Sequence, residues 1–148
     1  MLEQIMKEKI SADHLLYVSL KYTKTCDVIF NLIKRWEIMI NDSVETLLEN
    51  LKKKKKIKSI PDAPRQRIEI MKQNFKKNTE VMGTMELYEF FKRIDNLKTI
   101  RASEFRKDVR LIINDNGKEV IINLEKLKEY AATLESFISF IKQFLLAK

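Results

Sequence analysis

The sequence predicts a mainly α-helical protein: a bundle of four to five helices, some of them long, with one β-hairpin before the C-terminal helix. Three observations support this fold class. The 148 residues include only two Gly and two Pro, and none of these helix breakers comes before Pro61. Apolar residues recur every three or four positions over most of the chain. Residues 109–122 alternate instead, which is typical of strands. At this length we expect one domain, residues 1–148, with a single core.

The first sixty residues are expected to form one very long helix or two nearly collinear helices. An apolar stripe keeps its register from Leu15 to Leu51, with spacings that alternate between three and four. Two weak boundaries interrupt it: Thr23–Thr25, whose last residue can cap a new helix, and Asp42 with Glu45, which have capping-box spacing. Residues 52–64, which are basic and contain both prolines, should end the helix and connect it to the next.

Two shorter helices are expected after this connector. The first runs from about Arg65 to Lys76, and the second starts after a cap at Asn78 or Thr79. Their inward-facing residues are predicted to be Ile68, Met71 and Phe75 in the first and Val81, Met85, Tyr88 and Ile94 in the second.

A β-hairpin is predicted over residues 109–122. Val109, Leu111 and Ile113 alternate with polar or exposed positions, Asn-Asp-Asn-Gly supplies the turn, and the alternation resumes at Val120 and Ile122. Two strands alone are marginally stable, and this pair has apolar residues on both faces. The hairpin should therefore pack on the bundle or pair across a dimer.

The last segment is predicted to be a helix capped by Asn123. From Leu124 to Leu145 apolar residues recur at heptad spacing, and a row of aromatic residues runs beside them. This face is too wide for one neighbour, so the helix should lie between two other helices or between two subunits. A homodimer is expected, with candidate interface residues Leu127, Tyr130, Leu134, Phe137, Ile141 and Phe144.

The positive charge of the protein is concentrated in one segment. The formal net charge is +8, and residues 52–77 alone carry eleven basic and two acidic side chains. Such a cluster is typical of binding to the phosphates of RNA or DNA, but also of a solvated linker whose lysines favour a helix C-terminus. No aromatic side chain interrupts it before Phe75, so binding would be directed to the backbone of the nucleic acid. The candidate nucleic-acid-binding residues are Lys52, Lys53, Lys54, Lys55, Lys56, Lys58, Arg65, Arg67 and Lys72.

A second basic group surrounds the hairpin. It consists of Arg93, Lys98, Arg101, Arg106, Lys107 and Arg110. Three acidic residues, Asp95, Glu104 and Asp108, lie nearby in the sequence. We therefore expect this group to serve mainly in structural ion pairs.

Few side chains are available for catalysis. The chain has one His, His14, and one Cys, Cys26, which excludes an internal disulfide and a zinc site built from these residue types. On a continuous helix they would lie about 18 Å apart, too far for a catalytic pair, and only a tight hairpin at Thr23–Thr25 would bring them together. We expect a partly exposed His14, a core Cys26 and a core Trp36. No metal, no cofactor and no enzymatic activity are predicted.

The composition indicates a cytoplasmic protein. No apolar run approaches the 18 or so residues of a membrane span, and charges interrupt the first ten residues where a secretory signal would need an apolar stretch. The excess of Lys over Arg, together with the many Ile residues, favours a prokaryotic source.

Part of the chain resembles a known family. The segment from Ala12, which reads Ala-Asp-His-Leu-Leu-Tyr-Val-Ser-Leu-Lys-Tyr-Thr-Lys-Thr and continues from Asp27 to Leu51, is similar to the opening helices of the HEPN superfamily. The resemblance covers about a third of the chain. It implies a small prokaryotic helical bundle, often a dimer, in a family that includes RNA-cleaving toxins and partners of nucleotidyltransferases.

The active HEPN members carry an Arg followed after four to six residues by a His. Here the positions before His14 hold Glu8, Lys9 and Ile10, so no catalytic residue is carried over, and the hairpin also departs from the simplest form of that fold. The sequence thus predicts a non-enzymatic, dimer-forming protein that binds nucleic acid, RNA rather than DNA, through residues 52–77. The alternatives are a protein–protein interaction module, such as an antitoxin-like partner, and a HEPN-type ribonuclease.

Overall fold

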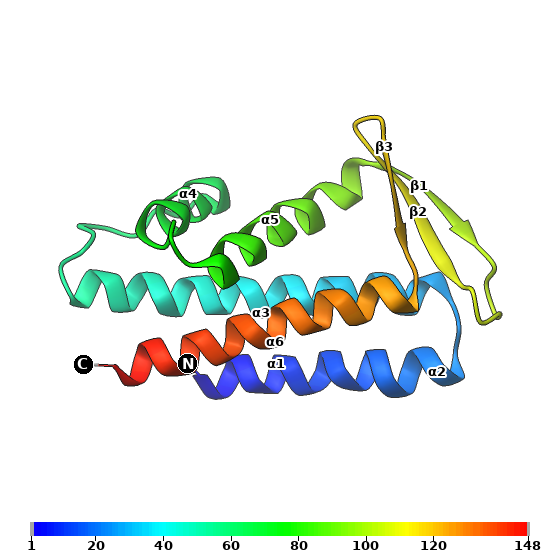
Figure 1. The fold of residues 1–148 in the computed structure, drawn as a ribbon, viewed down its shortest axis with the longest axis horizontal. Coiled ribbons are helices and arrows are strands. Elements are labelled where there is room, and N and C mark those ends of the chain that lie inside the picture. Colours follow the sequence, from blue (N-terminus) through cyan, green and yellow to red (C-terminus); the bar gives the residue numbers. More distant parts are fainter. Residues whose placement is uncertain (1, 148) are drawn as a thin grey trace.

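A computed structural model describes residues 2–147 and confirms the mainly α-helical fold (Figure 1). The elements are α1 (Leu2–His14), the π-helical turn η1 (Leu15–Ser19), α2 (Leu20–Tyr22), α3 (Cys26–Lys53), α4 (Pro64–Asn74), α5 (Thr79–Arg93), the 3-10 turn η2 (Ile94–Asn96), β1 (Lys98–Ala102), β2 (Arg110–Asp115), β3 (Lys118–Ile122) and α6 (Leu124–Leu146). Helices α1, α3 and α6 run along the long axis, α4 and α5 cover another side of α3, and the sheet stands at the end where α3 begins.

The expectation of one long or two collinear N-terminal helices is wrong. The chain reverses at Thr23–Thr25, so that α1 and α3 pack antiparallel (Figure 1). Thr25 caps α3 as predicted, because its side-chain oxygen accepts a hydrogen bond from the Val28 N–H at 3.4 Å. The apolar register survives the reversal because both helices face the same core.

The second expected boundary, at Asp42 and Glu45, is absent, because α3 continues without a break for 28 residues. The hydroxyls of Ser43 and Thr46 donate hydrogen bonds to the carbonyl oxygens one turn back, those of Met39 and Asp42. Both hydroxyl groups are thereby satisfied inside a buried stretch of the helix, and neither competes with the backbone as a cap would.

The helices that follow the connector agree with the prediction. The side chain of Asn78 accepts a hydrogen bond from the Val81 N–H at 3.0 Å and caps α5, and Asn123 does the same for α6 with the Lys126 N–H at 2.9 Å. The inward-facing residues predicted for α4 and α5 are all buried: Ile68, Met71, Phe75, Val81, Met85, Tyr88 and Ile94, the last in η2.

The predicted hairpin is confirmed as β2 and β3, and a third strand, β1, pairs with β2. Asn116 and Gly117 turn the hairpin with φ angles of 54° and 92°, the left-handed conformation that this turn requires. Leu111, Ile113 and Ile122 are fully buried against the bundle, which confirms that the hairpin packs there.

The core joins three helices through an aromatic cluster. The ring of Trp36 on α3 stacks on that of Phe91 on α5, with centroids 6.0 Å apart, and the ring of Tyr130 on α6 meets both edge-on. Burial raises the pKa of Tyr130 to about 12. The prediction that Trp36 belongs to the core is confirmed, since it is 3% exposed.

Candidate functional site

The basic segment begins where α3 ends, and the lysines themselves form the C-terminal cap. Lys55 adopts a left-handed conformation with a φ angle of 61°. Its N–H donates to the carbonyl of Lys52, and the N–H of Lys56 donates to that of Leu51, both at 2.9–3.0 Å. This is the Schellman arrangement, which satisfies carbonyl groups that the helix end would otherwise leave unpaired. The backbone of the lysine run is therefore ordered at its start.

The connector that follows is attached to the bundle. The side chains of Ile57 and Ile60 are half-buried against the core. The guanidinium Nε of Arg67 on α4 donates a hydrogen bond to the carbonyl of Pro61 at 2.6 Å, which ties the connector to the next helix. Lys58 lies between these attachments, and Lys55 and Lys56 lie between Ile57 and the end of α3. The connector is thus held against the bundle, whereas a freely solvated linker would have no such attachments.

Most of the predicted nucleic-acid-binding residues are free to meet a ligand. Two of the nine have structural roles: Arg67, as above, and Lys72, whose Nζ pairs with Glu89 at 2.6 Å. The Lys54 ammonium lies over the Phe144 ring, 4.6 Å from its centroid. Within residues 2–147, the other six make no ion pair and no side-chain hydrogen bond; all are exposed, and they are Lys52, Lys53, Lys55, Lys56, Lys58 and Arg65.

The helix dipole accounts for only a small part of this charge. The C-terminal end of a helix carries a partial charge of about −0.5 and favours cations within the last turn. Six positive side chains without a counter-charge exceed this several-fold, and four of them lie beyond the end of α3 at Lys53. The segment therefore holds an excess of positive charge that the fold itself does not neutralise.

The second basic group is divided between ion pairs and free side chains. Three arginines are paired, as expected: Arg93 with Asp115 at 2.8 Å, Arg101 with Asp27 at 2.8 Å, and Arg110 with Asp108 at 3.3 Å. The hydrogen bond that the Arg93 guanidinium donates to the Asp115 carboxylate lowers the pKa of Asp115. Within the described residues, no ion pair is formed by Lys98, Arg106 or Lys107.

The residues predicted as a dimer interface lie inside the chain. Leu127, Leu134, Phe137 and Ile141 are 0–2% exposed. Tyr130 and Phe144 are half-buried, Tyr130 in the aromatic cluster and Phe144 against Phe75. Of the two positions that the sequence leaves open, α6 takes the one between helices of its own chain, α3 and α5. The homodimer and its interface stay a prediction, to which Leu127, Leu134, Phe137 and Ile141 can offer almost no surface while α6 is packed.

His14 and Cys26 do not meet, although the hairpin at Thr23–Thr25 exists. The exposed His14 has its Nδ1 3.5 Å from the Ser19 hydroxyl. Cys26 is buried and its thiol donates to the Arg110 carbonyl at 3.4 Å. Burial raises the pKa of Cys26, which disfavours the reactive thiolate. Among residues 2–147, no three His, Cys, Asp or Glu side chains are grouped so that they could hold a metal ion.

The sequence reasoning missed a second gathering of lysines, at the opposite end of the molecule. Lys21, Lys24, Lys107 and Lys128 line one cavity with several apolar residues. They come from three separate segments of the chain, so no local pattern in the sequence predicts that they lie together. Lys107 was assigned to the paired arginine group on sequence proximity alone.

Comparisons with known proteins do not identify a family or a function for this chain. No family model, curated protein or solved structure matches the chain. The resemblance to the HEPN superfamily accordingly stays a prediction. No helix within the described part of the chain is long and apolar enough to cross a membrane.

Proposed function

We propose that this protein is a non-enzymatic nucleic-acid-binding module that contacts the phosphate backbone through the basic segment, residues 52–77. The observation that carries the proposal is a set of six exposed basic side chains without a counter-charge. Two lie on the last turn of α3, three on the connector, which is attached to the bundle, and one at the start of α4. A fixed array of positive charges binds a polyanion with less loss of conformational entropy than a flexible one.

The proposal specifies backbone contacts and little sequence preference. Lysine ammonium groups recognise phosphate as point charges, and the exposed part of the segment has no aromatic side chain on which bases could stack. RNA is preferred to DNA in this proposal only because the opening helices resemble those of the HEPN superfamily. The RNA is proposed to be bound and not cleaved, because the Arg that precedes the His in active HEPN members is missing before His14.

The test is fluorescence anisotropy of a labelled single-stranded RNA and a labelled DNA duplex, titrated with protein between about 50 and 300 mM salt. If six phosphates are neutralised, the logarithm of the association constant should fall with the logarithm of salt concentration with a slope of about −4 on single strands. Changing Lys52, Lys53, Lys55 and Lys56 together to Gln should reduce the magnitude of this slope by about 3. The RNA is checked afterwards on a denaturing gel for integrity.

A second variant controls for net charge. Lys7, Lys98, Arg106 and Lys118 are exposed and unpaired within residues 2–147 but lie away from the segment, and their joint change to Gln removes the same four charges. This variant should bind RNA almost as well as the original protein. Equal losses in both variants would mean that only net charge matters and would overturn the proposed site. No binding at low salt would favour the protein–protein interaction module instead.

A further inference from the structure

A cavity of about 400 Å³ is lined by residues of η1, α2, the loop between β1 and β2 and the start of α6. Figure 1 shows these elements at the end of the molecule where α3 begins, away from the end of α3 at which the basic segment starts. The floor of the cavity is apolar: Leu16, Leu20 and Val109 are only 2–3% exposed. Tyr17 and Leu124 stand at its rim and are 54% and 39% exposed. The volume falls in the range of about 300 to 1,000 Å³ that is typical of sites for small organic molecules.

One wall of the cavity is an irregular helix. The segment η1, Leu15–Ser19, is π-helical, which is rare and which in other proteins is often found at functional sites. The N–H of Leu20 donates to the carbonyl of Leu15, five residues earlier, which is the hydrogen bond of a π-helix. This local widening of the helix positions Leu16 and Tyr17 along the cavity.

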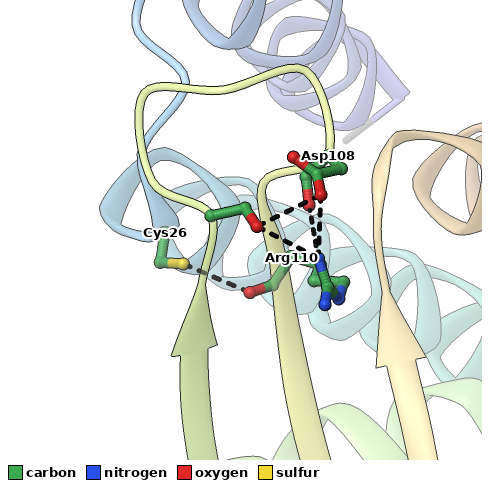
Figure 2. Close-up of polar contacts among 4 residues, drawn as sticks. Cys26, Asp108 and Arg110 are labelled. Carbon is green, nitrogen blue, oxygen red and sulfur yellow. Dashed lines mark hydrogen bonds and ion pairs between the residues drawn. The ribbon is translucent and has the colours of Figure 1, made fainter.

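The second wall, the loop between β1 and β2, is held against the start of α3. The backbone N–H of Cys26 donates to the Glu104 carboxylate at 2.9 Å, and the Cys26 thiol donates to the Arg110 carbonyl. Figure 2 shows this contact and, at the end of the same loop, the Arg110 guanidinium beside the Asp108 carboxylate. The loop is thus attached to the start of α3 near both of its ends, which fixes the position of this wall of the cavity.

Four lysines are among the residues that line the cavity. Lys21 comes from α2, Lys24 from the turn between α2 and α3, Lys107 from the loop and Lys128 from the first turns of α6. No acidic residue lines the cavity, and none of the four lysines forms an ion pair within residues 2–147. The Lys24 ammonium donates to the carbonyl of Lys21 at 2.6 Å. Four like charges around one opening repel each other, and an anion bound there would relieve the repulsion.

We propose that this cavity binds a small amphipathic organic anion, with an apolar body on the leucine and valine floor and a negatively charged head among the four lysines. The floor presents no hydrogen-bonding side chain, so a sugar or a nucleobase would lose its hydrogen bonds to water without replacement. An aliphatic or aromatic body makes no such hydrogen bonds to water and therefore loses none on binding. The site is separate from the proposed nucleic-acid interface, and neither depends on the other.

The first experiment uses 8-anilinonaphthalene-1-sulfonate, an aromatic anion whose fluorescence rises in apolar surroundings. The folded protein should bind one equivalent saturably, and decanoate should displace it. Decanol, which has the same body without the charge, should compete at least about tenfold less well, since it loses the lysine contacts. Inorganic phosphate and adenosine monophosphate should not compete. Displacement by either at the decanoate concentration would overturn the proposed ligand class.

Variants locate the site. Lys107→Gln with Lys128→Gln should raise the dissociation constant for the probe about tenfold, and Leu124→Glu, at an exposed rim position, should abolish binding by placing a carboxylate there. Lys7→Gln with Lys118→Gln removes the same two charges elsewhere, at exposed positions outside both proposed sites, and should leave binding unchanged. Circular dichroism confirms that each variant is folded. If the cavity variants bind the probe as well as the control pair does, the proposal is wrong.

Discussion

Lys55 ends α3 in a conformation that is unfavourable for a lysine. Its φ angle of 61° lies in the left-handed region, which costs a residue with a Cβ about 1–2 kcal/mol and costs glycine nothing. Glycine also loses more chain entropy on folding. We therefore expect Lys55→Gly to stabilise the protein by about 0.5–1 kcal/mol in urea unfolding followed by circular dichroism.

Lys53→Gly is the matched control for that change. Lys53 is the last helical residue of α3, so glycine there should destabilise the protein by up to about 1 kcal/mol. Opposite signs at two positions two residues apart would establish the role of the left-handed cap. A destabilising Lys55→Gly would contradict it. That a lysine occupies the cap position at all fits the proposed use of this segment in binding phosphate.

Asp42 on α3 carries a charge that the fold disfavours. Burial, followed by the negative charges of Glu8 and Glu45, raises the pKa of Asp42 above its ordinary value of 3.8. A carboxyl group whose pKa is raised in the folded state favours folding fully below the unfolded pKa, and this contribution is lost as the pH rises through the folded pKa. At pH 7 the ionised Asp42 therefore lowers stability relative to a neutral isostere.

The prediction is that Asp42→Asn raises the free energy of unfolding at pH 7. The gain should disappear near pH 2.5, roughly one unit below the ordinary pKa of 3.8, where the Asp42 carboxyl group is almost fully protonated in both the folded and the unfolded state. Urea unfolding at the two pH values measures it. Glu86→Gln, an exposed carboxyl on α5, should change stability little at either pH. A gain from Asp42→Asn that persists unchanged in acid would have a cause other than this ionisation.

The packing of α1 on α3 includes a buried carboxylate, that of Glu8, whose ion pair should contribute to the stability of the protein. The Glu8 side chain is 10% exposed, accepts a hydrogen bond from Gln4 at 3.0 Å and pairs with Arg35 on α3 at 3.2 Å. Arg35→Met should destabilise the protein by about 2 kcal/mol, because Glu8 would remain buried without its cation. The expected loss is below that for a fully buried pair because the Arg35 side chain is 43% exposed.

A double variant separates the loss of the ion pair from the cost of leaving the Glu8 charge buried without a partner. Adding Glu8→Met to Arg35→Met removes the buried charge and should recover much of the stability, measured by the same unfolding experiment. Lys126→Met, which breaks an exposed pair with Glu129 on α6, should cost less than about 1 kcal/mol. If the two changes at Glu8 and Arg35 simply add, the pair does not act as a unit.

At the level of the elements, the sequence predicted what depends on neighbours along the chain. The caps Thr25, Asn78 and Asn123 need only a side chain and the backbone three residues later, and all three are present. The reversal at Thr23–Thr25 was missed because a regular apolar stripe is the same for collinear and for antiparallel helices. Strand β1 was missed because Ile100 is its only large apolar residue, so it shows no alternation.

Of the two candidate sites, the one formed by residues adjacent in the sequence could be predicted and the other could not. The basic segment could be found from the sequence because its charges are consecutive, whereas its attachment through Ile57, Ile60 and Arg67 required the structure. The cavity at the other end could not be found, because its lysines lie up to about a hundred positions apart and meet only after the reversal and the sheet have formed. Long-range contacts of this kind leave no periodic signal.

The whole molecule carries its excess charge at one end, and this should reduce its stability. The basic segment has a local net charge of +9, while the rest of the chain sums to about −1. Like charges held close together by the anchored connector repel each other in the folded state more than in the expanded chain. Salt screens exposed charges, with a Debye length that falls to about 8 Å at physiological ionic strength.

Raising the salt concentration from about 20 to 300 mM should therefore raise the thermal midpoint of the protein. A screened repulsion of about 1 kcal/mol corresponds to roughly 2–4 °C in a domain of this size. The variant with Lys52, Lys53, Lys55 and Lys56 changed to Gln should start at a higher midpoint in low salt and gain less from added salt. The control variant at Lys7, Lys98, Arg106 and Lys118 should respond to salt as the original protein does, because its charges are dispersed. Equal responses from all three proteins would show that the clustering of charge has no energetic effect, and would remove one reason to regard the segment as awaiting a polyanionic partner.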